Sequence, residues 1–417
     1  MNKLFLLFRG PVQTRSGYGA HARDLLEALY KMDQFEIKID SCAWGSTPMT
    51  ALEKDNLFHN WIESNIVTAI PKKPDIYVQV TVPNEFQRMG TLNIGVTAGI
   101  ETTVAPKSWV DGCNRMDMII ATSQFSREVL LSTVYNETEN NTGKLIKQHR
   151  IEKPVAVLFE GVKTDIYNNV YTGIDFDINE DFAFLFVGHW LKGNIGQDRK
   201  DVGMLIKCFV EAFKDEEVKP ALILKTSSAT FSIKQREELS KKIKDIVGQM
   251  DNPPSIYLLF GDLTDKEMNE LYNHPKVKSM ISLTKGEGFG RPLLEFTMTG
   301  KPVIASNWSG HKDFLPLDKG IMIGGKLTEV DESVIDDFII KNSKWFTANY
   351  NEAAEVMKIV YKDYDKFTDR SEKLRQENME KFSFEAMIEQ FKKLVTTKPI
   401  EKPQQKQINL PKLNKIK

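Results

Sequence analysis

Cysteine is scarce in this sequence. Only Cys42, Cys113 and Cys208 occur among 417 residues, and they lie far apart with no paired spacing. This pattern argues against a disulfide framework and against a zinc site, and it is compatible with a reducing compartment. We therefore expect a cytoplasmic protein.

Long hydrophobic runs are missing as well. Near the start, basic Lys3 is followed by apolar residues, but the five apolar residues at 4–8 are too few for a signal peptide. No stretch approaches the length of a membrane span, so we expect no transmembrane segment. A first buried strand is the better interpretation of residues 4–8.

A charge excess of one sign is also absent. The 56 Lys and Arg residues balance 57 Asp and Glu residues, which gives a formal net charge of −1. The whole protein is therefore not a polyanion binder by bulk charge, although a local basic patch is not excluded. With 41% hydrophobic and 27% charged residues, the composition predicts a soluble globular protein. At 417 residues, two domains are the default.

The first part of the chain alternates apolar runs with amphipathic segments. Several runs are continuous, as expected for parallel strands covered on both faces. The expected strands are residues 4–8, 35–40, 76–80, 92–97, 118–122 and 155–159, and a helix is expected over 20–30. Strands separated by helical patterns predict a doubly wound α/β domain, here residues 1–165.

A polar stretch rich in Asn and Asp, residues 166–181, is expected to be a linker. A second series follows, with strands at 182–187, 221–225, 256–260, 277–283 and 302–305 and helices at 201–213, 233–247, 265–272 and 292–299. Residues 182–383 then form a second doubly wound domain, in which residues 345–364 are expected to be helical. We expect a helix at 384–397 to pack back on the first domain, and residues 398–417 to form a disordered basic tail.

A glycine-rich turn, KGEGFGRPLLE at residues 285–295, follows one of these strands and leads into a helix. Pro292 suits the first helical position, and Gly300 suits the residue just past the end. The glycines leave backbone N–H groups bare, and together with the helix N-terminus they would attract an anion.

Two acids, Glu287 and Glu295, flank this turn. A carboxylate accepts two hydrogen bonds side by side, so it suits vicinal hydroxyls. The combination favours a ligand with both phosphate and sugar, such as a nucleotide sugar. The competing interpretation is a βα turn with incidental glycines.

These residues resemble a known family, the retaining nucleotide-sugar glycosyltransferases of family 4, which have the GT-B fold. The acid pair and the following GKPVIA at 300–305 resemble the family signature, and other segments stand in the family's order. These are the Gly17-Tyr-Gly turn, EGVKTD at 160–165, the basic loop within 187–209, residues 260–272 and NWSG at 307–310. The match spans most of residues 1–315. It implies two Rossmann-like domains facing across a cleft, with the donor held mainly by the second and the acceptor mainly by the first.

The resemblance also implies roles for individual residues. Glu295 would bind the ribose hydroxyls, and Glu287 would bind the transferred sugar and β-phosphate with the backbone of Gly288, Phe289 and Gly290. Gly17 and Gly19 would let the N-terminal loop approach the phosphate. Where the family commonly has an arginine, this chain has His189, which could still donate a hydrogen bond but loses a fixed charge.

Glycosyl transfer leaves negative charge on the departing diphosphate, which preorganised donors must stabilise. The two Asp-x-Asp sequences, at 175–177 and 363–365, follow no convincing strand, and we interpret them as solvated acids. We therefore predict no metal and no cofactor, with Lys200 and Arg199 supplying the charge. The alternative interpretation of Arg199 and Lys200 is a solvated helix start that Asp201 helps to cap. Glu101 would lie near the acceptor and anomeric centre, or else in the first turn of a helix.

The acceptor stays open. The loops at 14–18, 43–50 and 82–89 hold side chains that suit many ligands: Arg15, Trp44, Phe86 and Arg88. A saccharide, a lipid-linked or cell-surface glycan, or a hydroxymethylated DNA base reached with help from the lysine-rich tail would fit. A non-catalytic nucleotide-sugar-binding protein and another GT-B enzyme, such as an epimerase, are the other candidate classes.

Overall fold

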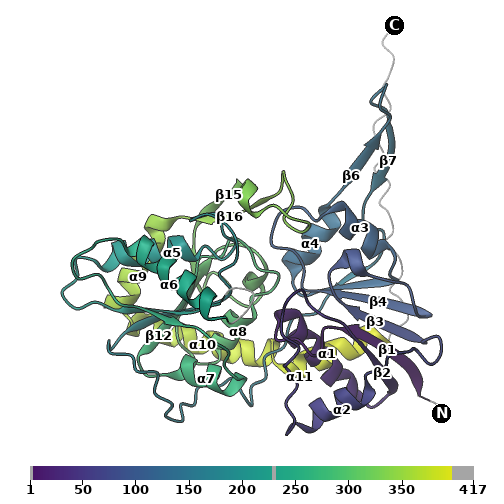
Figure 1. The fold of residues 1–417 in the computed structure, drawn as a ribbon, viewed down its shortest axis with the longest axis horizontal. Helices are drawn as coiled ribbons and strands as arrows, with labels where there is room; N and C mark the ends of the chain where they lie inside the picture. Colours follow the sequence, from purple (N-terminus) through teal and green to yellow (C-terminus); the bar gives the residue numbers. More distant parts are fainter. Residues whose placement is uncertain (1–2, 228–231, 397–417) are drawn as a thin grey trace.

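The first half of the chain folds around a six-stranded parallel sheet (Figure 1). The computed structural model describes residues 3–227 and 232–396. The strand order is β2-β1-β3-β4-β5-β8. The strands are β1 (Leu4–Gly10), β2 (Phe35–Ser41), β3 (Ile76–Val80), β4 (Leu92–Thr97), β5 (Met118–Ala121) and β8 (Val155–Val157). The helices are α1 (Gly17–Met32), α2 (Leu57–Asn65), α3 (Lys107–Asn114) and α4 (Gln124–Ser132).

Strand β1 shows why these runs are continuously apolar. Leu6 and Phe8 lie in the core that includes α1, whereas Leu7 lies in a separate core with Trp109 and Val110 of α3. Neighbouring residues of a strand point to opposite faces, and both faces of this sheet are covered by helices. An apolar residue is therefore favoured at every position.

A second parallel sheet follows, at the other end of the molecule in Figure 1, in the order β11-β10-β9-β12-β13-β14. Its strands are β9 (Ala183–Val187), β10 (Ala221–Lys225), β11 (Ile256–Leu259), β12 (Val277–Ser282), β13 (Val303–Ser306) and β14 (Ile321–Ile323). Its helices are α5 (Val202–Phe213), α6 (Ile233–Val247), α7 (Asp265–Asn273), α8 (Arg291–Thr297), α9 (Tyr350–Lys362) and α10 (Asp365–Lys381). This order is that of dinucleotide-binding folds. The prediction of two doubly wound sheets is confirmed.

The chain passes between the two sheets twice, and the two passages are hydrogen bonded to each other. The N–H of Val162 donates to the carbonyl of Phe382 at 2.9 Å, and the N–H of Phe384 donates back to Val162 at 2.8 Å. Immediately afterwards α11 (Phe384–Thr396) buries Phe384 and Phe391 in the core beside α1. The predicted return of the C-terminal helix to the first sheet is thus confirmed.

Within the described part of the chain, two hairpins lie outside the main sheets. One joins β6 (Tyr135–Thr138) to β7 (Leu145–His149) and projects from the first sheet unit (Figure 1). The other joins β15 (Gly325–Glu329) to β16 (Lys344–Ala348). The expected helix over 345–364 is therefore wrong in its first quarter, residues 345–349. The helix α9 begins only after Asn349, whose side chain caps it by accepting from the N–H of Glu352.

The segment predicted as a linker, residues 166–181, contains no helix or strand and lies against α7. The N–H of Asn168 donates to Asn269 Oδ1 at 3.0 Å, and the N–H of Thr172 donates to Glu270 Oε2 at 3.0 Å. This polar stretch is thus fixed to the second sheet unit by its Asn and Thr residues. The predicted tail at 398–417 lies outside the described residues, and the predicted domain boundaries stay predictions.

Candidate active site

The glycine-rich turn connects the carboxyl end of β12 to α8. It lies where the second sheet unit meets the first domain. Gly290, at φ 98°, stands at the N-cap, and Pro292 lies in the first turn of α8. Gly300, at φ 73°, lies just past the helix. A left-handed residue before the helix favours glycine, so the local sequence explains the sharp turn. The helix starts one residue earlier and ends two residues earlier than predicted.

The glycines of the turn admit the backbone of the first domain. A side chain on Gly286 would collide with the carbonyl of Glu101, and one on Gly288 would collide with the carbonyl of Ala98. The carbonyl of Gly288 accepts a hydrogen bond from Ser123 Oγ at 2.6 Å, at the start of α4. The two domains are therefore in direct contact at this turn. Sequence reasoning missed Ser123, because a single serine before a helix predicts only an N-cap.

Glu287 lies at the centre of this contact, and its side chain is only 9% exposed. Lys200 Nζ forms a short ion pair with Glu287 Oε1, and Arg199 Nη1 lies 3.5 Å from Oε2. Burial alone would raise the pKa of the Glu287 carboxyl, but these two positive charges outweigh it and lower the pKa to about 2. Three of the predicted site residues are thus brought together as charged groups.

Glu101 faces the same cluster from the first domain. Its Oε1 lies 3.6 Å from Arg199 Nη1, on the loop that follows β4. Burial raises the pKa of the Glu101 carboxyl, and Arg199 opposes that shift. The alternative of an acid in the first turn of a helix is wrong, because α3 begins only at Lys107.

A second buried ion pair holds the loop that carries Arg199 and Lys200. Asp201 is fully buried, and its Oδ2 lies 3.1 Å from Lys285 Nζ and accepts from Tyr350 Oη at 2.7 Å. The carboxylate that bonds the first turn of α5 is Asp198, which accepts from the N–H of Val202 at 3.2 Å. The alternative of a solvated helix start is therefore wrong: Asp201 stands at the N-cap of α5, but it is buried and its side chain makes no bond to the helix. Its role here is to fix the glycine-rich turn and the basic loop to each other.

His189 stands near the basic pair but bonds elsewhere. Its Nδ1 lies 3.0 Å from Ser227 Oγ. Lost hydration lowers the pKa of the ring, and the positive charges of Lys200 and Arg199 lower it further. The ring is therefore neutral at pH 7, and any hydrogen bond it makes is that of an uncharged imidazole.

Glu295 is engaged by Arg291 of the same helix. Arg291 Nε donates to Glu295 Oε1 at 2.8 Å, and Arg291 Nη1 lies 2.5 Å from Asp24 Oδ2 on α1. Burial raises the pKa of the Glu295 carboxyl to about 7 although Arg291 opposes the shift. Sequence reasoning missed Arg291, which links the predicted ribose acid to the opposite domain.

The two glycines at the start of α1 differ in their surroundings. No atom lies within 4 Å of the place that a side chain on Gly17 would occupy, so this residue borders open space. A side chain on Gly19 would collide with Thr14 of the same loop. Phe289 is buried in the core against Phe314, at 5.1 Å between ring centroids, so only its backbone is available to a ligand.

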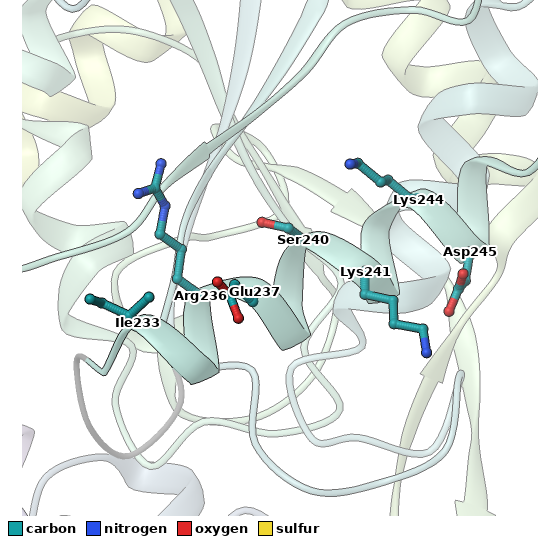
Figure 2. A pocket seen from close by; sticks show the side chains of 7 residues that line it. All are labelled: Ile233, Arg236, Glu237, Ser240, Lys241, Lys244 and Asp245. Carbon is teal, nitrogen blue, oxygen red and sulfur yellow. The ribbon is translucent and has the colours of Figure 1, made fainter.

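A surface hollow lies elsewhere, along α6 (Figure 2). All seven lining residues belong to that one helix. The side chains of Arg236, Lys241 and Lys244 extend from it in different directions and do not converge. A one-sided depression of this kind does not enclose a ligand, so the candidate site stays at the domain interface.

Residues 3–227 and 232–396 show neither a metal-binding group nor a membrane-spanning helix. In those residues no three His, Cys, Asp or Glu side chains are grouped so as to hold a metal ion. Nor does any helix there have the length and apolar character needed to cross a bilayer.

Comparison with known proteins supports the fold. No family model and no curated protein matches the sequence. Among solved structures, Anabaena HepE in complex with UDP-glucose has a TM-score of 0.59 at 14% identity, over 94% of this chain and 99% of that chain. Sucrose-phosphate synthase from Thermosynechococcus elongatus has a TM-score of 0.60 at 12% identity, over 94% and 98%. A glycosyltransferase from Rickettsia africae has a TM-score of 0.58 at 14% identity, over 94% and 98%. The chain therefore has the GT-B fold, as predicted.

Proposed function

We propose that this protein is a retaining glycosyltransferase that moves a sugar from a nucleoside-diphosphate donor to a hydroxyl acceptor without a catalytic metal. The observation that carries the proposal is the buried cluster of Lys200, Arg199 and Glu287 facing Glu101 across the domain interface. The GT-B fold supports it, because ligands of open α/β sheets bind outside the carboxyl ends of the strands, where this cluster lies.

The cluster suits the charge that develops in such a reaction. The bond between the anomeric carbon and the diphosphate oxygen breaks, and a bond from the acceptor oxygen to the same carbon forms. Lys200 and Arg199 stabilise the negative charge on the leaving diphosphate, since they are held in place before the reaction by Glu287 and the Asp201–Lys285 pair. The leaving phosphate takes the acceptor's proton in a same-face attack.

Glu287 and Glu295 bind different parts of the donor. Glu287 lies against Lys200 and binds the transferred sugar, with the backbone of residues 288–290 beside it. Glu295 binds the ribose, and for this it must give up part of its contact with Arg291. A carboxyl with a pKa raised to about 7 can accept or donate hydrogen bonds to hydroxyls.

The test is nucleotide release. Because HepE was solved with UDP-glucose, that donor heads a panel that also varies the base and the sugar. We expect release of the nucleoside diphosphate with EDTA present, and a product that keeps the anomeric configuration of the donor by NMR. Duplex DNA with hydroxymethylated bases is included in the acceptor panel as the alternative acceptor. The lysine-rich tail, which lies outside the described residues, suggested it.

Replacement of Lys200 gives the most direct test of the proposed mechanism. Lys200→Met should lower kcat by about 100-fold with little change in donor KM, because its charge is needed most as the diphosphate leaves. Lys207→Met is the matched control, since Lys207 lies on the exposed side of the adjoining helix α5. Equal turnover in the Lys200→Met and Lys207→Met variants would rule out the proposed mechanism. Turnover that stops when EDTA is added would rule it out as well.

A further inference from the structure

A stacked aromatic pair lies beside the proposed site on the first domain. Tyr18, in the first turn of α1, and Trp44, in the loop after β2, have ring centroids 4.1 Å apart and planes 23° apart. Tyr18 Oη accepts from the N–H of Ala98 at 3.1 Å and lies 2.9 Å from Thr97 Oγ1. The pair is therefore fixed to the end of β4.

This position is next to the reacting groups of the proposed function. Ala98 is the residue against which Gly288 packs, and Glu101 follows three residues later on the same loop. The pair thus stands on the acceptor side of the interface, beside Glu101 and opposite the glycine-rich turn.

The loop that carries Trp44 is held in place by the loop before α1. The N–H of Arg15 donates to the carbonyl of Pro48 at 3.2 Å, and the N–H of Ala51 donates to Gln13 at 3.0 Å. Trp44 stays partly exposed, and open space borders its neighbour Gly45. A rigid aromatic surface next to open space can bind a ring at small entropic cost.

The other side chains predicted for the acceptor are already engaged or buried. Arg15 forms an ion pair with Asp262 of the second domain, and Arg88 Nη1 lies 2.8 Å from Asp117 Oδ1. Phe86 is 1% exposed. Of the four residues that sequence reasoning selected, Trp44 is the one placed to meet a ligand.

Two basic side chains of β1 and α1, in the same domain as the pair, are already engaged by the protein. Arg9 forms an ion pair with Asp40, and Arg23 Nη1 donates to the carbonyls of Val12 and Thr14 at 3.0 and 2.9 Å. These cations, like Arg15, are satisfied by the protein. A phosphate backbone would need free positive charge here, whereas the C–H face of an uncharged sugar ring needs only the negative face of an indole.

We infer that Trp44, backed by Tyr18, binds an uncharged pyranose ring of the acceptor. The inference rests on the proposed function and specifies its acceptor as a saccharide. The indole provides the surface on which the ring stacks, so that an acceptor hydroxyl reaches the anomeric carbon held by the opposite domain.

The test compares Trp44→Ala and Trp44→Phe with wild-type enzyme on methyl pyranosides and disaccharides. Binding is measured by calorimetry with nucleoside diphosphate present, and transfer is measured by steady-state kinetics. We expect Trp44→Ala to raise the acceptor KM by roughly five-fold or more while the donor KM changes less than two-fold, and Trp44→Phe to recover part of the loss. Trp61→Ala is the control, because Trp61 stacks on Phe58 in α2, in the same domain but in a different core.

The outcomes separate this inference from the proposed function. If wild-type enzyme releases no nucleotide from any donor, the proposed function fails. If it does release nucleotide but Trp44→Ala leaves the KM of every accepted saccharide unchanged, only the inference fails. It also fails if no pyranoside binds or is glycosylated, and if hydroxymethylated DNA is glycosylated in place of saccharides.

Discussion

Two glycines of the glycine-rich turn, Gly286 and Gly288, let the two domains approach each other, because a side chain on either would collide with the backbone of the first domain. The turn was correctly located from Gly290, Pro292 and Gly300, because their backbone preferences are local. The reason for Gly286 and Gly288 could not be found in the sequence, since they admit the backbone of residues 98–101, which is far away along the chain. Long-range packing of this kind leaves no local pattern.

The two glycines of α1 give a prediction for stability. Gly19→Ala should lower the free energy of unfolding by about 2 kcal/mol, because the new side chain would overlap the carbonyl of Thr14. Gly17→Ala should change it by less than about 1 kcal/mol, because its site is open. Urea denaturation checks both values. A loss of transfer in a stable Gly17→Ala protein would support the predicted approach of this residue to the donor.

Glu160 gives a prediction for pH dependence. Burial raises the pKa of this carboxyl to about 7, against the attraction of Arg291 and with added repulsion from Asp24, Glu295 and Glu287. The folded protein thus holds this proton more tightly than the unfolded chain, so this group destabilises the fold increasingly from about pH 4.5 to 7 and fully above it.

Glu160→Gln imitates the protonated form and should therefore stabilise the protein by about 3 kcal/mol at pH 8 and by almost nothing at pH 4. Thermal unfolding at the two pH values measures the difference. Glu238→Gln, on the exposed surface of α6, is the control and should show no such dependence. An equal effect of Glu160→Gln at both pH values would contradict the raised pKa.

Whole elements were predicted well where both faces are buried. Strands β3, β4 and β10 match their predicted bounds, because their mainly apolar runs are typical of strands covered on both faces. The hairpin of β15 and β16 was missed, since Trp345 and Phe346 read as the start of the helical pattern that continues into α9. Pairing with a strand distant in sequence decided the outcome there.

The hairpin of β6 and β7 gives a prediction for an element. It pairs only within itself, and its strands are exposed apart from Tyr135 and His149 at the base. Tyr135 Oη donates to the carbonyl of Ala105 at 2.7 Å, so the base is fixed. Because an isolated two-stranded sheet adds little stability, replacing residues 137–147 by a short glycine turn should shift the unfolding midpoint by less than about 2 °C.

Transfer to small saccharides should survive that replacement, because the hairpin lies away from the interface (Figure 1). Exposed Leu145 and Ile146 would disappear with it. A protein that folds but no longer transfers would show that the hairpin meets the acceptor.

At the scale of the whole molecule, the two domains are held together by buried charge. Arg291 pairs with Asp24 across the interface, and Lys163 beside the passage between domains lies 3.2 Å from the same carboxylate. The fold could be predicted from sequence because its strands repeat a regular pattern twice. The arrangement of these charges could not, since Asp24 and Arg291 are 267 residues apart.

In the proposed function, this geometry couples donor binding to domain closure. Arg291 contacts Glu295, the proposed ribose acid, and Asp24 with the same guanidinium. Asp24→Asn should therefore open the domains and lower kcat/KM by about 100-fold or more, if most of the roughly 3–5 kcal/mol typical of a broken buried pair is lost. Arg291→Met should do the same, and the double variant should lose less than the sum of the two, because both changes remove one interaction.

Small-angle scattering with and without nucleoside diphosphate measures the opening, and a double-mutant cycle on kcat/KM measures the coupling. Arg375→Met is the control, because Arg375 pairs with Glu372 within α10, three residues apart in sequence. If the effects of Asp24→Asn and Arg291→Met simply add while the scattering stays that of wild type, Arg291 acts on Glu295 alone. The ribose site and the acceptor domain would then respond to the donor independently, because no shared charge would link them.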